Sequence, residues 1–451
     1  MRTGVVALAV VLLVLAPLRS ARAQFSFDAR RYGMGGVSLS RDGNARRYNP
    51  AYRAVGNKNK VSGAPKFSIP IPLGLIDFFK DHPINQLGHD PMFSPDSAGF
   101  NPIAMLDLVL NPPIFYELKK APAPTNNVEF TIGRNALVVD LGASKVLIPE
   151  QDFGLGTTSR LLDVGFGVAG FHVGFMGFLE YDVDFALDST LRGFLVGDSA
   201  RPLTDYFVNT DATAQAGIAP TVSYAGRLYK GATGNDTDDG IYLGGALHYY
   251  LGATYGRAFG PAGFTTGPVV LATTPNPLVN GSLLTSNKPN GHGVGGDVGV
   301  VWITGPFEVG FGVNDIGAEL TWSDTKVQQY VYDTVADQIA KTVTANHVST
   351  KTKLPLTYMG NAAIHMGTGT TVGGDVVNSG RKTIIHVGAE QRYGPFAVRG
   401  GVSRDQRKKM QFGLGGGLRF GSIGLDVGMW THSNSLSTQR AVTLATSISI
   451  Y

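Results

Sequence analysis

Residues 179–188 read Leu-Glu-Tyr-Asp-Val-Asp-Phe-Ala-Leu-Asp, so that apolar and polar side chains alternate. A period of two residues is typical of a β-strand, whose successive side chains point to opposite faces. One face carries Leu179, Tyr181, Val183, Phe185 and Leu187, and the other carries the acidic row Glu180, Asp182, Asp184 and Asp188. Four carboxylates cannot be buried in a dry core, although they can line water. We therefore expect the apolar face to contact lipid and the acidic row to face the lumen of a membrane barrel.

The same alternation recurs in the C-terminal part of the chain, at residues 307–314, 411–420, 422–429 and 441–451. Glycine repeatedly occupies the face opposite the apolar one. A closed barrel explains inward glycines because they leave room for a plug or a ligand, whereas a soluble β-sandwich turns its apolar face inward. The pattern predicts an all-β chain forming a transmembrane antiparallel β-barrel of about 14 strands, an even number. A soluble all-β secreted protein is the alternative.

The composition supports this class. The chain has 451 residues, 60 glycines, no cysteine and only 16% charged residues. The lack of cysteine excludes disulfides, thiolate metal sites and a cysteine nucleophile. No apolar run beyond the N-terminus is long enough for a helical membrane span.

The N-terminus has the features of a cleaved signal peptide. Arg2 precedes the apolar run 5–16, and Ala21-Arg22-Ala23 forms a small-x-small cleavage site. The other interpretation, an anchoring helix, requires a longer apolar run. We expect residues 1–23 to be removed and the chain to be exported to the outer membrane. Removal of the three leader arginines takes the net charge from +4 to +1, so the charge gives no reason to expect nucleic-acid binding.

Three regions interrupt the strand pattern. Residues 24–57 are rich in Gly and Arg and precede the barrel, which we place at 58–451 with a first strand at about 58–70. Residues 75–120 combine apolar clusters with Asn-Pro turns, which predicts a partly helical extracellular insert. Residues 255–292 are rich in Gly, Pro, Thr and Asn, which predicts a long loop.

The segment after the leader carries a distinctive motif. It contains Arg30-Arg31-Tyr32-Gly33-Met34-Gly35-Gly36, then Asp42-Gly43-Asn44-Ala45, then Asn49-Pro50-Ala51. This order resembles the opening of the FadL-like outer-membrane barrels, which include fatty acid and hydrocarbon transporters and PorV-like proteins of secretion systems. The resemblance departs at Tyr52-Arg53, where the family usually has Gly-Leu.

In the fatty acid transporters the opening segment forms a hatch inside the barrel. The resemblance implies that residues 24–57 are a hatch and that its residues include Gly33, Met34, Gly35, Gly36, Asn49, Pro50 and Ala51. It implies passive uptake of hydrophobic small molecules, with outer-membrane lipid and a fatty-acid-like or hydrocarbon-like ligand as partners. A PorV-like barrel that binds secreted or surface proteins fits the same motif.

Enzymatic and metal chemistry find little support. In the stretch 431–435, His432 and Ser433 are adjacent, so in a strand they point to opposite faces and cannot form a nucleophile–base pair. Alternate strand residues lie ~6.6–6.8 Å apart, so the acidic row fits a pairing with Arg419 or with the hatch arginines better than a metal site. We expect no enzyme activity, no metal and no cofactor.

Overall fold

The computed structural model describes most of the barrel and most of the N-terminal segment. It covers residues 28–39, 43–56, 65, 67–86, 90, 116–119, 129–133, 136–140, 153–231, 238–270, 276–333, 335, 338–367, 369–380, 382–404, 410–431 and 441–451. The leader, much of the predicted insert and residues 432–435 lie outside these ranges.

Seventeen antiparallel strands form one large sheet. In chain order they are β1 (Phe67–Ile71), β2 (Tyr116–Lys119), β5 (Phe153–Val168), β6 (Phe171–Leu187), β7 (Asp205–Lys230), β8 (Gly240–Thr265), β9 (Asn276–Ser286), β10 (Gly291–Thr304), β11 (Phe307–Asp333), β12 (Gln338–Lys353), β13 (Thr357–Met366), β14 (Thr370–Ser379), β15 (Lys382–Tyr393), β16 (Phe396–Arg404), β17 (Met410–Phe420), β18 (Ile423–Thr431) and β19 (Ala441–Ile450). The hairpin β3 (Glu129–Gly133) and β4 (Ala136–Asp140) forms a separate sheet.

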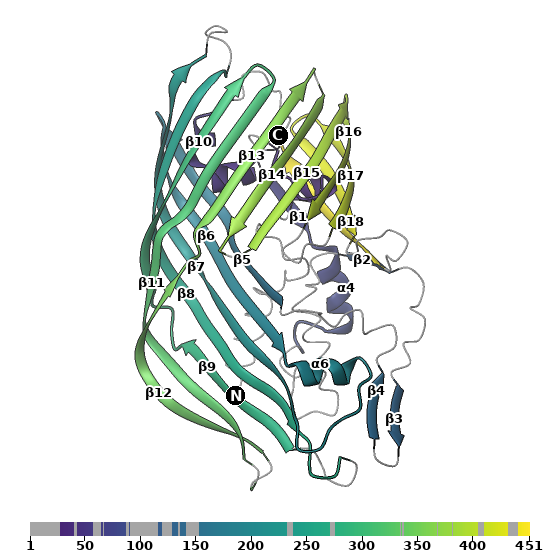
Figure 1. Cartoon of the computed structure of the whole chain (residues 1–451). Coiled ribbons are helices and arrows are strands. Elements are labelled where there is room, and N and C mark those ends of the chain that lie inside the picture. Colours follow the sequence, from purple (N-terminus) through teal and green to yellow (C-terminus); the bar gives the residue numbers. More distant parts are fainter. Residues whose placement is uncertain are drawn as a thin grey trace.

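The ladders run from β5 round to β19, and Figure 1 shows the sheet curled into a barrel. Three positions in the wall are each shared by two strands. β9 and β10 both lie between β8 and β11, β12 and β13 both pair with β11, and β1 and β2 both pair with β19. When each shared position is counted once, the seventeen strands occupy fourteen positions around the wall. This confirms, for the described residues, the predicted barrel of about 14 strands. Within the same residues, no ladder joins β5 to β1 or β2.

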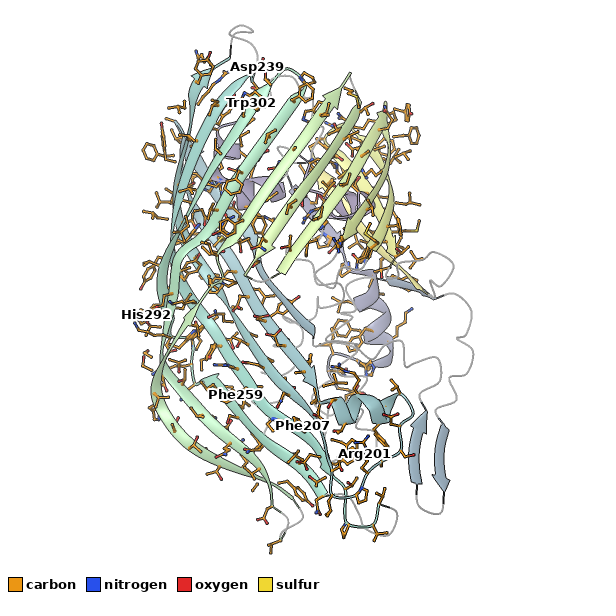
Figure 2. The ribbon with its side chains drawn as sticks, viewed as in Figure 1. Arg201, Phe207, Asp239, Phe259, His292 and Trp302 are labelled. Atoms are coloured by element: carbon orange, nitrogen blue, oxygen red, sulfur yellow. The ribbon has the colours of Figure 1, made fainter. Side chains whose placement is uncertain are left out.

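A belt of exposed apolar side chains surrounds the upper barrel in the view of Figure 2, with Trp302 among them. On β11 the belt side chains Phe307, Val309 and Phe311 alternate with buried Glu308, as the sequence pattern predicts. The belt also includes Phe171, Val222, Leu247, Val298, Ile364, Val387, Val398, Leu414, Leu425 and Ile448. An outward apolar belt with inward polar residues is the arrangement of a membrane barrel.

The wall is much taller on one side. β7, β8 and β11 have 26, 26 and 27 residues, whereas β13 to β19 have between 9 and 12. At ~3.3–3.4 Å per residue, β11 is about 90 Å long, far more than the ~25 Å of a lipid-facing band. The parts of the long strands beyond the lipid-facing band form a sheet, which we call the extension. It is made of 178–187, 205–217, 252–265, 276–286, 317–333 and 338–353. Phe207 and Phe259 lie on it in Figure 2.

Two predictions about this region were wrong. Residues 255–292, predicted to be a loop, contain the end of β8, all of β9 and the start of β10. The Gly and Asn positions there sit within paired strands because the ladder to β7 and β11 supplies the stability that local propensity lacks. The apolar face of 179–187 does not contact lipid: Leu179 and Tyr181 are buried, and the lipid-exposed part of β6 is 171–175.

Helices lie inside and beside the barrel. Within the lumen are α2 (Ala29–Gly33), α3 (Gly43–Tyr48) and the short 3-10 helix η1 (Pro50–Arg53). α4 (Leu73–Asp81) belongs to the predicted insert and confirms that it is partly helical, and α6 (Ser189–Leu195) follows β6. No helix among the described residues is both long and apolar enough to cross a membrane.

Candidate functional site

The N-terminal segment, residues 28–39 and 43–56, crosses the lumen between opposite walls. α2 packs on β17 and β18, and η1 packs on β8 and β10. Each helix begins at a side-chain cap: Asp28 accepts a hydrogen bond from the Arg30 amide (3.0 Å), and Asn49 accepts one from the Ala51 amide (3.0 Å). Gly35 and Gly36 have φ of 69° and 93°, a turn conformation that glycine adopts without strain.

Inward glycines of the wall form the surface on which this segment lies. A Cβ at Gly401 of β16 would overlap the backbone of Met34, and a Cβ at Gly312 of β11 would overlap the Tyr48 carbonyl. The same close approach occurs at Gly244, Gly299, Gly310, Gly373, Gly388, Gly413, Gly415 and Gly428. We call these ten residues the glycine seat. It extends from β8 to β18, so the segment packs closely against the wall on both sides of the lumen.

A first group of buried charges holds α2. The Arg30 guanidinium donates to both oxygens of Glu390, at 2.8 and 3.1 Å, and both side chains are nearly inaccessible to water. Arg399 donates to the same carboxylate at 2.7 Å and pairs with Asp426 at 2.7 Å. The Ala29 amide donates to Ser447 at 3.2 Å. Bidentate contacts of this kind fix the orientation of α2 as well as its position.

These contacts shift the titration of the segment. Burial alone would lower the pKa of Arg30, but the Glu390 carboxylate raises it above its ordinary value, so Arg30 stays charged. Loss of solvent raises the pKa of Asp28, and the Asp426 carboxylate raises it further. The site therefore disfavours the charged form of Asp28 while it favours the charged form of Arg30.

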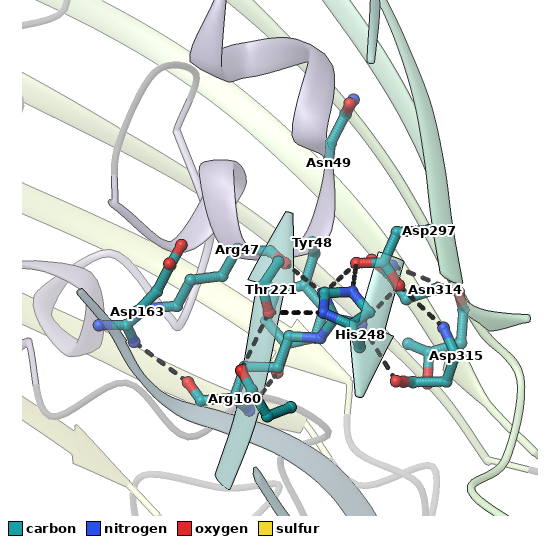
Figure 3. Close-up of polar contacts among 12 residues, drawn as sticks. Arg47, Tyr48, Asn49, Arg160, Asp163, Thr221, His248, Asp297, Asn314 and Asp315 are labelled. Carbon is teal, nitrogen blue, oxygen red and sulfur yellow. Dashed lines mark hydrogen bonds and ion pairs between the residues drawn. The ribbon is translucent and has the colours of Figure 1, made fainter. Parts of the chain in front are cut away.

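A second group of charges holds the other half of the segment, as Figure 3 shows. Arg160 of β5 forms ion pairs with Asp297, to which Nη2 donates at 2.7 Å, and with Asp315 at 3.1 Å. Its Nη1 also donates to the Arg47 carbonyl at 2.9 Å, and this bond joins wall to segment. His248 lies 2.7 Å from Asp297 and 2.8 Å from the Thr221 hydroxyl.

A β-bulge brings Asp315 into this group. The register between β10 and β11 shifts twice near Gly296, and Asp315 has a φ of 61°. Asn314 and Asp315, although consecutive, are both buried, whereas the flanking Ile316 is exposed on the outer face. A bulge therefore turns an extra carboxylate inward, where it pairs with Arg160 and accepts from the Tyr250 hydroxyl at 2.7 Å.

A small cavity, partly open to solvent, lies beside this second group. Its lining includes Arg46, Arg47 and Arg53 from the segment and Arg160 and His248 from the wall. Asp163 and Asp297 also line it and pair with Arg53 and Arg160. The enclosed part has room for roughly one water molecule, so the groups mainly satisfy one another.

Asn49 links η1 to the wall. Besides capping η1, it donates from Nδ2 to the Val300 carbonyl at 3.0 Å, and it is fully buried. The neighbouring Tyr52 hydroxyl accepts from Asn361 at 2.6 Å. The amide is suited to this position because it both donates and accepts, which a carboxylate cannot do.

Replacing Asn49 with aspartate is expected to destabilise the protein by about 1–3 kcal/mol at neutral pH. The carboxylate would face the Val300 carbonyl without a proton to donate. Burial raises the pKa of such a carboxyl, and its protonated form can donate to Val300. The loss should therefore be smallest at acidic pH and grow as the pH rises through that raised pKa. Urea unfolding of Asn49→Asp and the wild type at several pH values measures this, and a pH-independent loss would contradict it.

The structure places the sequence-predicted residues as follows. Gly33, Met34 and Gly35 lie against the seat at β15–β18, and the Gly36 amide donates to the Arg31 carbonyl at 2.9 Å. Asn49, Pro50 and Ala51 lie against β8, β10 and β11. Of the acidic row, Glu180 is buried and accepts from Gln215 at 2.9 Å, and Asp182 and Asp184 are exposed in the extension. Asp188 is not part of the row, because it follows β6 and caps α6 by accepting from the Thr190 amide.

The pairing partners of the segment differ from those expected. Arg30 pairs with Glu390 rather than with the acidic row, and Arg419 stacks on Tyr451 at 4.1 Å. Sequence reasoning missed Arg160, Asp297, Glu390, Arg399 and Asp426. The signal available was their position: Asp297, Glu390 and Asp426 are carboxylates within strands whose other face is apolar.

Three solved structures are similar to this chain. The toluene transporter TbuX of Ralstonia pickettii has a TM-score of 0.33 and 12% identity, over 69% of this chain and 95% of that one. The CymD monoaromatic hydrocarbon channel has a TM-score of 0.32 and 12% identity, over 71% of this chain and 95% of that one. The Pseudomonas putida toluene transporter TodX has a TM-score of 0.30 and 10% identity, over 72% and 94%. No family model and no curated protein matches. Because these TM-scores are low, the assignment of the barrel rests on the strand ladders and the apolar belt.

Proposed function

We propose that the chain is an outer-membrane channel for passive uptake of hydrophobic small molecules of the fatty-acid or hydrocarbon kind. The observation that carries this proposal is the filling of the lumen. The N-terminal segment lies on the glycine seat from β8 to β18, with buried charges at both ends. A general porin needs an open aqueous channel, whereas a hydrophobic solute can travel along apolar side chains.

An apolar cluster inside the barrel supports a route for such solutes. Phe178, Tyr250, Tyr255 and Trp322 are buried together beyond the seat, next to Leu320. Tyr255 and Trp322 stack with centroids 5.5 Å apart, and Phe178 meets Tyr250 edge to face at 5.2 Å. Such rings offer large apolar contact surfaces to a solute that displaces them.

The orientation follows from the turns. Four of the connections at one end, β5–β6, β10–β11, β15–β16 and β17–β18, are two residues long, and the C-terminal Tyr451 lies at this end. Among the other strand connections of the described sheet, only β14–β15 is as short. Short turns are periplasmic in bacterial outer-membrane barrels, so the extension faces outward. We infer that the leader is cleaved after Ala23 and that the mature chain inserts in the outer membrane. The proposal includes no catalytic role.

Native mass spectrometry of the gently extracted barrel tests the transport proposal. We expect one acyl chain or hydrocarbon per barrel, and uptake of that compound class should fall when the gene is deleted. The matched control is uptake of a small hydrophilic sugar, which should not change. An empty barrel together with unchanged uptake of every hydrophobic compound tested would overturn the proposal.

A second function is favoured by the extension. A PorV-like barrel that binds secreted or surface proteins needs a surface beyond the membrane, and the extension supplies strands of up to about 50 Å outside the belt. The same mass spectrum distinguishes the two functions. A protein partner in fixed ratio, without a bound lipid or hydrocarbon, would favour protein binding.

A further inference from the structure

Among the described strands, β12 forms an edge of the extension. It pairs with β11 through Asp333↔Gln338 to Glu319↔Lys353, and no ladder of the described strands joins its other side, because β13 pairs with β11 and β14. The neighbouring wall does not cover it, because β14 ends at Ser379, which pairs with Thr357 at the start of β13. An edge of this length leaves a row of backbone N–H and C=O groups able to accept a further strand.

The edge has two regular stretches separated by an irregular one. Residues 338–343 pair with β11 without a shift, and so do 350–353. Between them the register shifts three times, and His347 has a φ of 54°. A partner strand would therefore pair with one regular stretch at a time, and 340–343 has exposed Lys341, Thr342 and Val343.

The charge of the edge selects the kind of partner. β12 contains Lys341, Lys351 and Lys353 and not a single Asp or Glu. Lys351 is paired with Glu319 at 2.9 Å, and Lys353 lies opposite the same carboxylate in the ladder and interacts with it electrostatically. The Lys341 ammonium lies over the Tyr330 ring at 5.8 Å, and no ion pair of Lys341 is found among the described residues. Two copies joined through β12 would bring lysines of one copy towards lysines of the other, and like charges across a ladder are destabilising. An acidic strand would meet complementary charge.

We propose that β12 is a docking edge to which an extended acidic segment of another protein adds as an antiparallel strand. Backbone hydrogen bonds would supply the sequence-independent part of the affinity. The lysine of the occupied stretch, Lys341 in 338–343 or Lys353 in 350–353, would supply the preference for carboxylates. The inference goes beyond the transport proposal, because a barrel that moves no solute keeps this edge unchanged.

The test uses the purified full-length barrel and a short fluorescent peptide of alternating Glu and Val. A peptide with Lys in place of Glu is the charge control. We expect the acidic peptide to raise fluorescence anisotropy at low salt, with weaker binding as salt is added. The variant Lys341→Glu/Lys353→Glu should bind about tenfold more weakly or worse. The matched variant is Lys230→Glu, an exposed lysine at the short-turn end, which should bind as the wild type does.

A single introduced thiol maps the docking position, because the chain has no cysteine of its own. An acidic peptide whose cysteine is activated as a mixed disulfide with 2-thiopyridine should exchange with the thiol of Thr342→Cys, releasing 2-thiopyridone, much faster than with that of Lys230→Cys. The first position lies on a regular stretch of the edge, whereas the second lies at the short-turn end, away from it.

Three outcomes would overturn the proposal. The first is an equal disulfide rate at positions 342 and 230, and the second is equal binding of the acidic and lysine peptides. The third is a dimer of the barrel that forms without peptide and disappears in the Lys341→Glu/Lys353→Glu variant, since a second copy would then be the occupant. Uptake of hydrophobic compounds by the Lys341→Glu/Lys353→Glu variant should stay unchanged. A failure of the docking proposal can therefore be told apart from a failure of the transport proposal.

Discussion

Replacing Gly401 with valine is expected to unseat the N-terminal segment and turn a closed barrel into a conducting one. A Cβ at this position would overlap the Met34 carbonyl and come within 2.8 Å of the Gly35 nitrogen. Both are backbone atoms, so no side-chain rotation relieves the clash. Overpacking in a filled interior costs about 1–3 kcal/mol, and here the segment can relieve it by leaving its seat.

The neighbouring Gly400 provides the matched control. It lies on the same strand, β16, but a Cβ there meets only a Leu414 side-chain atom at 3.8 Å, an ordinary contact. Single-channel conductance in planar bilayers and protease cleavage of the N-terminal segment measure the effect. We expect both to rise for Gly401→Val and to match the wild type for Gly400→Val. Equal conductance of the two variants would show that the seat does not hold the segment.

Replacing Glu390 with glutamine is expected to cost about 3–5 kcal/mol of unfolding free energy. The carboxylate is buried and pairs with Arg30, with Arg399 and, at 3.7 Å, with Arg392. Arg399 keeps Asp426 as a partner, but Arg30 loses its bidentate contact inside a nearly dry site. The Asp28 carboxylate still acts on Arg30, but weakening the compensation of a buried charge costs far more than losing a surface pair.

The exposed pair Arg257–Asp211 gives the comparison, since its side chains are 43% and 49% exposed. Asp211→Asn should cost about 0–1 kcal/mol, and less in high salt. Urea unfolding in lipid vesicles measures both variants. The double variant Arg30→Met/Glu390→Met should recover part of the loss, because no buried charge of this pair then remains. If Glu390→Gln and Asp211→Asn cost the same, the buried network does not anchor α2.

Much of the fold was predictable because lipid imposes a simple rule on the wall. Where a strand faces lipid on one side and the lumen on the other, alternation follows, as at 307–314. The stretch 179–188 was correctly predicted to be a strand, β6, but its surroundings were predicted wrongly. Alternation shows that the two faces of a strand differ, but it does not show whether lipid or protein covers the apolar face. For this reason Leu179 was predicted to contact lipid although it is buried.

The site was less predictable because its partners are far apart in sequence. Arg30 and Glu390 are separated by 360 residues, and nothing local marks either as the partner of the other. The bulge that turns Asp315 inward depends on the ladder with β10. The N-terminal motif indicated which residues lie in the lumen, but the wall residues that hold them follow from the strand register, which is set only in the assembled sheet.

The glycine seat has a consequence for biogenesis. A segment that touches strands from β8 to β18 so closely has no free path into a barrel that has already closed. We therefore expect it to be in place while the strands assemble, so that the wall forms around it. The N-terminal segment would then act as an internal template for the barrel, and variants that lack the segment should be inserted in lower yield.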